Sequence, residues 1–340
     1  MKLVLFALHG YLELFKKRGQ KTLFEYAKKE NFETFMEKGR WGYLLLDKTI
    51  EKSYFKFLLP DSFFPGHSFL RALKYPIPSK KNDLFFLCKF VSALENKIIE
   101  TEVSLNLKEK QKLIEEIKKG NKNNEFYVYE KDIILKISKD LPLLENNFPN
   151  KIRDKNFDEI KFKNEQFEEI NAIMTNSFKI LNLHPINKIR IDLNEPVANF
   201  LYLYGMGKFS EKLVFSDKIG KDTFYFSDSE TLEGLRIFLN IEKIDKFPNI
   251  KNRSFYWFNF ALNSKETPSI WVKNFETISK NILRQLTLSE DIRFLFIFDP
   301  FMDENYEYEK LSSIFLSVNF VRKQKKKYKN PSVLFKSFLE

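Results

Sequence analysis

The chain has 340 residues, of which 43% are hydrophobic and 16% aromatic, with 38 phenylalanines and 10 glycines. This composition supports a sizeable core in one large or two ordinary domains and excludes an intrinsically disordered chain. The net charge is +11, but the lysines are spread along the whole sequence, so the charge alone does not favour a nucleic-acid or membrane partner. The single cysteine, Cys88, excludes a disulfide framework and a zinc site built on several cysteines.

The first ten residues, MKLVLFALHG, open with a short apolar run that lacks a small-residue cleavage site, so we do not expect a signal peptide. No stretch approaches the roughly 20 apolar residues of a membrane span, and we expect a cytoplasmic protein without a membrane partner. Residues 2–8 are apolar on both faces, which predicts a central strand of a parallel sheet. His9 and Gly10 follow this strand and would place a polar group at its end.

Helix and strand patterns are mixed in the middle of the chain. Residues 21–38 and 106–119 have apolar residues at helical spacing, the second with Asn106 as its N-cap and Gly120 at its end. The other predictions are an ordered loop with a short helix over 60–83, paired strands over 84–105 and 125–137, and an amphipathic helix over 164–182. We therefore expect an α+β middle block.

Buried-strand patterns return from residue 198 onward. The predicted strands are 199–207, 212–217, 222–227, 254–262 and 294–299, and the helices between them include 230–239 and 272–286. Strands that alternate with helices predict a doubly wound, mostly parallel sheet, so the expected fold class is α/β. The expected domains are a discontinuous core of residues 1–83 and 195–340 and an inserted α+β domain of residues 84–194.

Catalytic motifs are scarce. The sequence has no G-x-S-x-G elbow, Walker loop or dinucleotide fingerprint, and its histidines are His9, His67 and His184. Asp299 ends an apolar strand, where doubly wound sheets place ligands, although an aspartate before a proline also caps loops. The basic stretch RKQKKKYKN, residues 322–330, would suit either nucleic-acid phosphates or a solvated terminal segment.

Three stretches, in order, resemble the archaeal-type cofactor-independent phosphoglycerate mutases of the alkaline phosphatase superfamily. They are KTLFEYAKKENFETFMEKGRWG, GHSFLRALKYPIPSKKNDLFFLCKFVS and NAIMTNSFKILNLHPINKIRIDLNEPVANFLYLYGMG. The third is the strongest, and it keeps in register His184, Pro185, Asn187, Arg190, Pro196, Ala198, Asn199, Gly205 and Gly207. The resemblance covers most of the chain and weakens after about residue 210.

The resemblance implies an alkaline-phosphatase-like core that carries two manganese or zinc ions, and an inserted domain that helps to bind a sugar phosphate. A serine would accept the phosphoryl group and return it to the other hydroxyl of glycerate. Two divalent ions would activate this nucleophile, and arginines would hold the phosphate. By the same resemblance, Asn187, Arg190 and Asn199 are candidate substrate-binding residues.

The positions that carry the family's chemistry are mostly replaced. The first metal-binding aspartate reads His9, and the nucleophilic serine falls near Lys48 or Thr49. At the positions of the family's late metal motif the chain has Asn259, Ala261, Ser264 and Pro268, and the position of the last histidine ligand falls near Lys310 or Leu311. At the positions of the family's substrate contacts it has Leu87, Lys89, residues 100–105 and Tyr204. Asp299 alone keeps the type of a metal ligand, so a two-metal site lacks most of its ligands.

We therefore predict a degenerate relative that acts as a non-catalytic binding or interaction protein, with a protein partner or a second copy of itself as the expected partner. No cofactor is expected, and manganese or zinc would be bound only if the family site is retained. The first alternative is an enzyme with altered or residual mutase or phosphatase activity, with Thr49, His9 and Asp299 as candidate catalytic residues. The second alternative is an anion or nucleic-acid binder that uses the lysine excess. If side chains fill the old cleft, the expected aromatics are Phe63, Phe64, Phe258 and Trp271.

Overall fold

The computed structural model describes residues 2–18, 20–28, 30–120, 124–246, 253–262, 265–283, 291–300 and 311–318, together with Leu334 and Phe338. The chain forms two compact units, the first from the described residues of 1–64 and 212–340 and the second from those of 65–211. Among the described helices, none has the length and apolar character needed to cross a bilayer.

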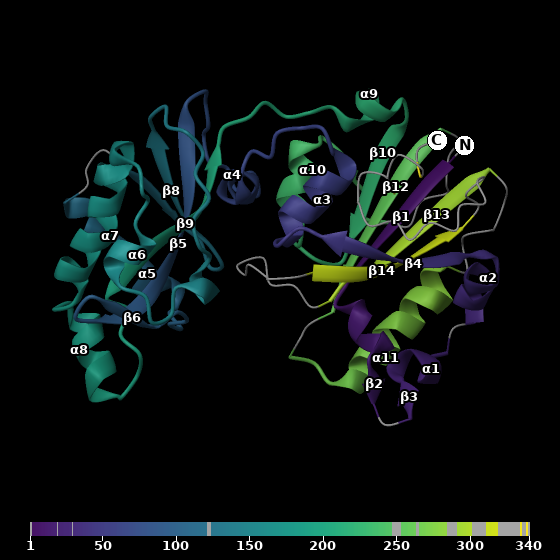
Figure 1. Cartoon of the computed structure of the whole chain (residues 1–340), viewed down its shortest axis with the longest axis horizontal. Coiled ribbons are helices and arrows are strands. Elements are labelled where there is room, and N and C mark those ends of the chain that lie inside the picture. The colour runs from purple at the N-terminus through teal and green to yellow at the C-terminus, as the bar shows by residue number, and fades with distance from the viewer. Residues whose placement is uncertain are drawn as a thin grey trace. The chain divides into compact units, whose positions relative to one another are not determined.

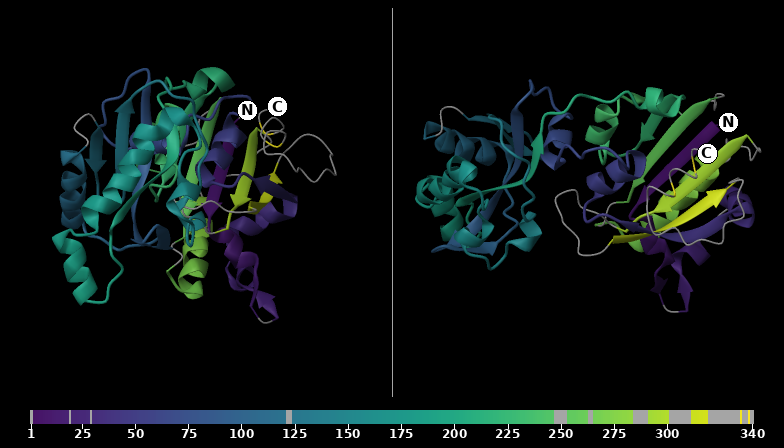
Figure 2. Two further views of the ribbon diagram at one scale, coloured as in Figure 1. Left: turned by 60° about the vertical axis from the view of Figure 1, so that its left-hand side comes forward. Right: turned by 45° about the horizontal axis from the view of Figure 1, so that its top comes forward.

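The first unit is built on a mostly parallel sheet. Its strands are, in spatial order, β11 (Glu242–Lys243), β10 (Asp222–Ser227), β12 (Ser254–Ala261), β1 (Lys2–His9), β13 (Ile292–Phe298), β14 (Leu311–Val318) and β4 (Arg40–Leu46). The first strand of the chain, β1, lies between β12 and β13 and is parallel to both (Figure 2). Only β14 runs antiparallel to its neighbours β13 and β4. The predicted α/β class with a largely parallel central sheet is therefore confirmed.

Helices cover both faces of this sheet (Figure 1). One face carries α3 (Ile50–Leu58) and α10 (Glu233–Phe238), and the other carries α1 (Leu23–Tyr26), α2 (Glu30–Lys38) and α11 (Pro268–Thr277). The remaining short elements are η1 (Tyr11–Phe15), β2 (Lys17–Arg18), β3 (Lys21–Thr22), α9 (Phe215–Ile219) and η4 (Ile278–Ile282).

A cluster of phenylalanines forms the core beneath α2 and α11. Phe6 of β1 stacks between Phe258 of β12 and Phe296 of β13, with ring centroids 4.9 and 4.6 Å apart. Phe32 of α2 and Phe275 of α11 pack on the same side, 5.4 Å apart. Because side chains alternate across a strand, the residues between these phenylalanines face α3 and α10 instead.

The second unit is an antiparallel sheet with helices packed against it. Its strands, in spatial order, are β6 (Lys97–Glu100), β5 (Asp83–Leu94), β8 (Ile133–Ser138) and β7 (Glu125–Val128), and β9 (Phe200–Lys208) also pairs with β5. The helical elements are α4 (His67–Ala72), α5 (Leu107–Lys119), η2 (Pro149–Lys151), α6 (Phe157–Ile160), η3 (Glu165–Phe167), α7 (Glu168–Leu181) and α8 (Pro185–Asp192). Asn106 and Glu109 form a capping box at the start of α5, as the sequence predicted for its N-cap.

Three predicted elements differ from the structure. The strand predicted at 199–207 exists as β9, but it pairs with β5 in the second unit rather than with the core sheet. It is buried on both faces, and this pattern also occurs in central parallel strands, so periodicity could not assign its sheet. Residues 212–217 were predicted as a strand and instead lead into α9, while 21–38 contains two helices separated by the extended residue Ala27.

The borders of the compact units also lie away from the predicted borders at 83/84 and 194/195. The second unit begins at Pro65 because α4 and the preceding turn pack on β9. Gly66, at φ 97°, forms a bridge with Gly207, where a Cβ on Gly66 would lie 2.2 Å from the Met206 carbonyl oxygen. Only a glycine tolerates both this backbone angle and this close approach.

Candidate functional site

The strand register brings His9, Asn259 and Asp299 together at the carboxyl end of the core sheet. The amide of Asp299 donates to the carbonyl of Leu8 at 2.9 Å, which continues the parallel pairing of β13 and β1 and places Asp299 beside His9. Asn259 of β12 is paired with Ala7, two residues before His9 on the same face of β1. Carboxyl ends of parallel strands are where α/β sheets hold their ligands.

The carboxylate of Asp299 is fully buried and accepts hydrogen bonds on both of its oxygens. The Tyr54 hydroxyl donates to Oδ2 at 2.6 Å, and the Ser313 hydroxyl donates to Oδ1 at 2.5 Å. His9 Nδ1 lies 2.9 Å from Oδ2. Each contact comes from a different element, since Tyr54 belongs to α3, Ser313 to β14 and His9 to β1.

The Asn259 side chain fixes the role of the other histidine nitrogen. Asn259 Nδ2 lies 2.8 Å from the carbonyl oxygen of Thr231, which can only accept, so this atom is the amide nitrogen. The same nitrogen lies 2.9 Å from the Tyr225 hydroxyl and 3.1 Å from the Ser227 hydroxyl. Asn259 Oδ1 therefore faces His9 Nε2 at 2.6 Å and accepts a hydrogen bond from it.

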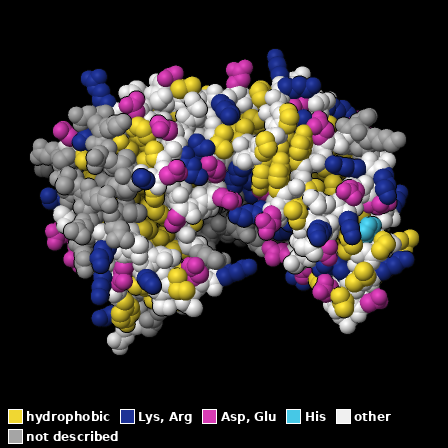
Figure 3. All heavy atoms as spheres, turned by 180° about the vertical axis from the view of Figure 1, so that it is seen from behind, with side chains coloured by type: hydrophobic (Ala, Val, Ile, Leu, Met, Phe, Trp, Pro, Cys, Tyr) yellow, Lys and Arg dark blue, Asp and Glu magenta, His cyan; other side chains and the backbone are white. Residues whose placement is uncertain are grey.

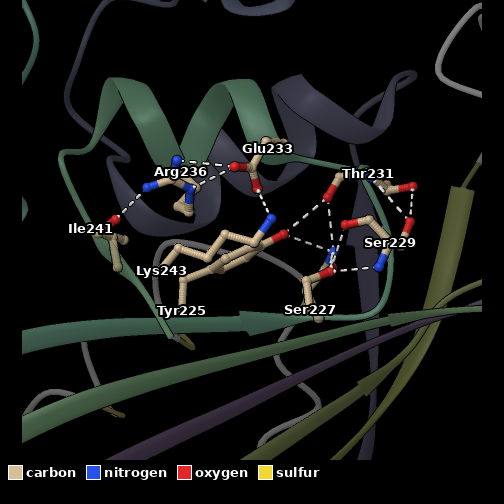
Figure 4. A network of polar contacts seen from close by, with 9 residues as sticks. Tyr225, Ser227, Ser229, Thr231, Glu233, Arg236, Ile241 and Lys243 are labelled. Carbon is tan, nitrogen blue, oxygen red and sulfur yellow. Dashed lines mark hydrogen bonds and ion pairs between the residues drawn. The ribbon is translucent and has the colours of Figure 1, made fainter. Parts of the chain in front are cut away.

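The loop after β10 is ordered by its own hydroxyl groups and supports Asn259. Ser227, Ser229 and Thr231 hydrogen-bond one another over 2.7 to 3.0 Å, and the Tyr225 hydroxyl donates to the Thr231 carbonyl at 3.1 Å (Figure 4). The partners of Asn259 are thus themselves held in place by the loop. We call the set His9, Asp299, Tyr54, Ser313 and Asn259 the His9–Asp299 network.

Burial keeps the phenol of this network protonated. Burial raises the pKa of Tyr54 well above its usual range, and the neighbouring Asp299 carboxylate raises it further. Asp228, directly after β10, is an acidic residue close enough to His9 for their charges to interact. Its carboxylate accepts a hydrogen bond from the Ala261 amide at 3.4 Å. Burial raises the pKa of Asp228 as well, against a smaller opposite effect of His9. Sequence reasoning missed Asp228, although a polar residue at the end of an apolar run is the signal that pointed to His9.

The residues at this site do not fit a two-metal centre. Among the described parts of the chain, no group of three or more His, Cys, Asp or Glu side chains is arranged to hold a metal ion. Asp299 is the single carboxylate of the network, and its oxygens already accept from two hydroxyl groups. Two divalent cations need several anionic or imidazole ligands, which this donor set lacks. Ser264 and Lys310, which the resemblance aligned with metal ligands, lie outside the described residues.

The remaining candidate catalytic residue, Thr49, and the aromatics predicted to fill the cleft have the following places in the fold. Thr49 is buried at the N-terminus of α3, where its carbonyl oxygen accepts from the Ser53 hydroxyl at 2.6 Å. Phe258 and Trp271 belong to the core beneath α2 and α11, so the prediction that they fill the cleft beside His9 was wrong. Phe63 is 73% exposed.

Other aromatic residues cover the His9–Asp299 network, and sequence reasoning did not identify them. The Tyr54 ring meets the His9 ring edge to face at 5.2 Å. It also stacks on Trp257, at a centroid distance of 6.1 Å, and Trp257 meets Tyr225 edge to face at 4.9 Å. Phe64 instead packs against Phe55 of α3 at 5.2 Å.

The three candidate substrate-binding residues lie in the second unit and bond to its backbone. Asn187 donates to the carbonyls of Leu181 and Ala198 at 2.8 and 3.1 Å and accepts from the Ala198 amide at 2.7 Å. Asn199 bonds the amide and the carbonyl of Ala93, both at 2.8 Å.

The polar contacts of Arg190 also lie within the second unit. Its Nε donates to the Pro196 carbonyl at 2.7 Å, and its guanidinium forms ion pairs with Glu109 at 3.5 Å and Glu195 at 3.3 Å. These contacts give the matched residues of 184–207 a structural use that needs no ligand.

The lysine excess forms no dominant patch on the face drawn in Figure 3, where Lys and Arg side chains are interspersed with Asp and Glu. The basic stretch 322–330 lies outside the described residues.

Comparisons with known proteins agree on one relationship. A sequence model of the family described as 2,3-bisphosphoglycerate-independent phosphoglycerate mutase matches residues 59–187. The chain is 25% identical over 261 residues to "2,3-bisphosphoglycerate-independent phosphoglycerate mutase 2" of Methanocaldococcus jannaschii, a match that spans 67% of this chain and 60% of that relative. It is 24% identical over 200 residues to the phosphoglycerate mutase of Methanococcus maripaludis, spanning 55% of this chain and 48% of that relative.

Solved structures share the fold. The cofactor-independent phosphoglycerate mutase of Thermoplasma acidophilum aligns with a TM-score of 0.54 at 17% identity, over 92% of this chain and 89% of that one. A protein of Pyrococcus horikoshii aligns with a TM-score of 0.61 at 16% identity, over 98% and 92% of the two chains.

Proposed function

This chain is a relative of the 2,3-bisphosphoglycerate-independent phosphoglycerate mutases, and we propose that it is a non-catalytic one that acts as a binding or interaction protein. The observation that carries the proposal is the His9–Asp299 network. Where the resemblance implies metal ligands, the side chains present bond to one another.

The chemistry of these side chains supports the loss of metal-dependent phosphoryl transfer. A divalent cation at this place would have to displace the Tyr54 and Ser313 hydrogen bonds from Asp299. It would also lie beside His9, whose Nδ1 is 2.9 Å from the same carboxylate. Moreover, Asn259 directs Nδ2 towards hydroxyl and carbonyl oxygens, while its only acceptor atom is used by His9.

The positions implied to bind substrate support the same proposal. Where the resemblance places an arginine and an asparagine, the chain has Leu87 and Lys89, and a further arginine position holds Tyr204. Replacing guanidinium groups with apolar and phenolic side chains removes the bidentate contacts that recognise a phosphate.

The alternative of an enzyme with altered chemistry would use His9 as a proton acceptor. The geometry disfavours this role, because His9 is 3% exposed and Nε2 already donates to Asn259. Its Nδ1 faces Asp299, so neither nitrogen is directed at a place where a substrate proton could be taken.

The test of the proposal is turnover of 3-phosphoglycerate by the purified full chain, with manganese or zinc supplied, beside an active phosphoglycerate mutase as the positive control. We expect no conversion to 2-phosphoglycerate above the buffer rate. Metal-dependent turnover that is lost in Asp299→Ala while the variant stays folded would contradict the proposal.

A further inference from the structure

The helix α8 of the second unit carries apolar side chains on the side that faces solvent. Ile189 and Leu193 are 58% and 63% exposed, Pro185 is also exposed, and Ile186 is half-buried. At about 100° of rotation per residue, these four positions lie within roughly a third of the helix circumference, and we call them the α8 face. Figure 1 shows α8 at the periphery of its unit, and Figure 3 shows exposed hydrophobic side chains in this part of the surface, with charged ones beside them.

The other side of α8 is anchored to its unit. Asn187 is buried and joins the backbones of Leu181 and Ala198, and Arg190 donates to the Pro196 carbonyl. These bonds fix the orientation of the helix, so burying the α8 face requires little further ordering of the chain. Single exposed apolar residues are ordinary on a protein surface, whereas a contiguous group on a fixed helix marks an interaction site.

Two charged side chains border the α8 face and indicate its partner. Lys188 and Asp192 are exposed and lie one helical turn apart, and within the described ranges of the chain neither forms an ion pair. If two α8 helices lie antiparallel about a twofold axis at the level of residue 190, Lys188 of each copy lies beside Asp192 of the other. From this self-complementarity we infer that the α8 face binds a second copy of this chain.

The charges also select the direction of the pair. Parallel helices would bring lysine beside lysine and aspartate beside aspartate, and these like charges would oppose association. In the antiparallel pair the two Ile189 side chains meet near the axis, and Leu193 of each copy lies against Ile186 of the other. A helix of eight residues is about 12 Å long, so the interface is small and the expected dimer is transient.

This inference rests on the proposed role as an interaction protein, and sedimentation velocity of the full chain at increasing concentration tests it. We expect the sedimentation coefficient to rise reversibly towards that of a dimer, with a dissociation constant in the micromolar range. A chain that stays monomeric up to about 0.5 mM would overturn the inference, and the α8 face would then belong to a different protein partner.

Two isoleucines of α8 supply a matched pair of variants. Ile189→Glu brings two carboxylates together near the axis and should abolish self-association over the range in which the wild type dimerises. Ile191 has the same exposed fraction, 58%, but lies about 200° away around the helix, so Ile191→Glu should leave dimerisation unchanged. Dimerisation of Ile189→Glu as tight as that of the wild type would overturn the inference.

Charge reversal tests the antiparallel register. Lys188→Glu and Asp192→Lys each convert both symmetry-related contacts into like-charge contacts, and each should weaken self-association about tenfold. In a mixture of the two variants, one chain of each kind restores both contacts between opposite charges. The mixed dimer should therefore form about as tightly as the wild-type dimer. A mixture that shows no preference for the mixed dimer would overturn the inference.

The two proposals fail separately. Turnover of 3-phosphoglycerate would contradict the non-catalytic role whatever the oligomeric state. A monomeric chain without turnover would remove the second copy as the partner and leave the proposed loss of catalysis in place.

Discussion

The His9–Asp299 network and the pocket of the second unit are both polar, but their polar groups differ in how they are satisfied. In the network, each oxygen of the buried carboxylate meets a hydroxyl donor, and His9 Nδ1 lies 2.9 Å from Oδ2. The pocket of the second unit has a volume of about 110 Å³ and is lined by Lys89, Lys110, Lys131 and Asp132 beside apolar residues, and Asp132 forms an ion pair with Arg71. Buried polar groups that satisfy one another stabilise a fold, whereas a hollow lined by charged side chains leaves room for water or a ligand.

At both places the chain has residue types other than those that the resemblance implies. At the carboxyl end of the core sheet, His9 and Asn259 stand where the resemblance implies metal ligands. Their side chains form a hydrogen bond between neighbouring strands. At the pocket, Leu87 and Tyr204 bring less polar groups than the residues that the resemblance implies, and space remains. A closed network and a remaining hollow therefore occur in one chain.

Asp299→Ala should have the largest effect on stability. It leaves the Tyr54 and Ser313 hydroxyl groups buried without their acceptor and removes the carboxylate beside His9. We expect a loss of about 3–5 kcal/mol in the free energy of unfolding. Urea unfolding measures it, with exposed Asp61→Ala as a control expected to stay within about 0.5 kcal/mol of the wild type. A loss below about 1 kcal/mol for Asp299→Ala would contradict a structural role for the network.

Asn187→Ala should have the next largest effect. The substitution breaks the hydrogen bonds that join Leu181 and Ala198, and it should cost about 2–3 kcal/mol in urea unfolding. Lys188→Ala, the adjacent exposed residue of α8, is the control. If Asn187→Ala left stability unchanged, the structural interpretation of the residues shared with the phosphoglycerate mutases would be wrong.

Asp228→Asn should have a smaller effect and one of opposite sign. Because burial raises the pKa of Asp228 in the folded state, the folded chain binds this proton more readily than the unfolded chain. Stability from this group therefore falls as pH rises from the unfolded pKa through the raised folded pKa. The variant should be about 0.5 kcal/mol more stable than the wild type at pH 7, and the difference should shrink towards pH 4. Destabilisation at pH 7 would instead indicate that His9 holds the Asp228 carboxylate in its charged form.

Most of the fold could be predicted from local patterns. Residues 2–8 are apolar on both faces and form the central strand β1, and the Asn106 cap marks the start of α5. The sheet to which β9 belongs could not be predicted, because a strand buried on both faces reads the same in either sheet.

The candidate site was predictable only in part. His9 and Asp299 were found because each ends an apolar strand, and the register of β1 and β13 then places them together. Tyr54 and Ser313 escaped notice, since they reach the carboxylate from a helix and an antiparallel strand through tertiary contacts that leave no sequence pattern. Trp257 covers the network instead of Phe258 because the two are neighbours on opposite faces of β12.

The central claim is that the side chains at the carboxyl end of the core sheet satisfy one another and do not hold metal ions. The most direct test is metal analysis of the full chain after incubation with manganese and dialysis, combined with its melting temperature in manganese and in EDTA. We predict no stoichiometric metal and equal melting temperatures. Two bound ions per chain, with a melting temperature raised by manganese and lowered by EDTA, would contradict the account.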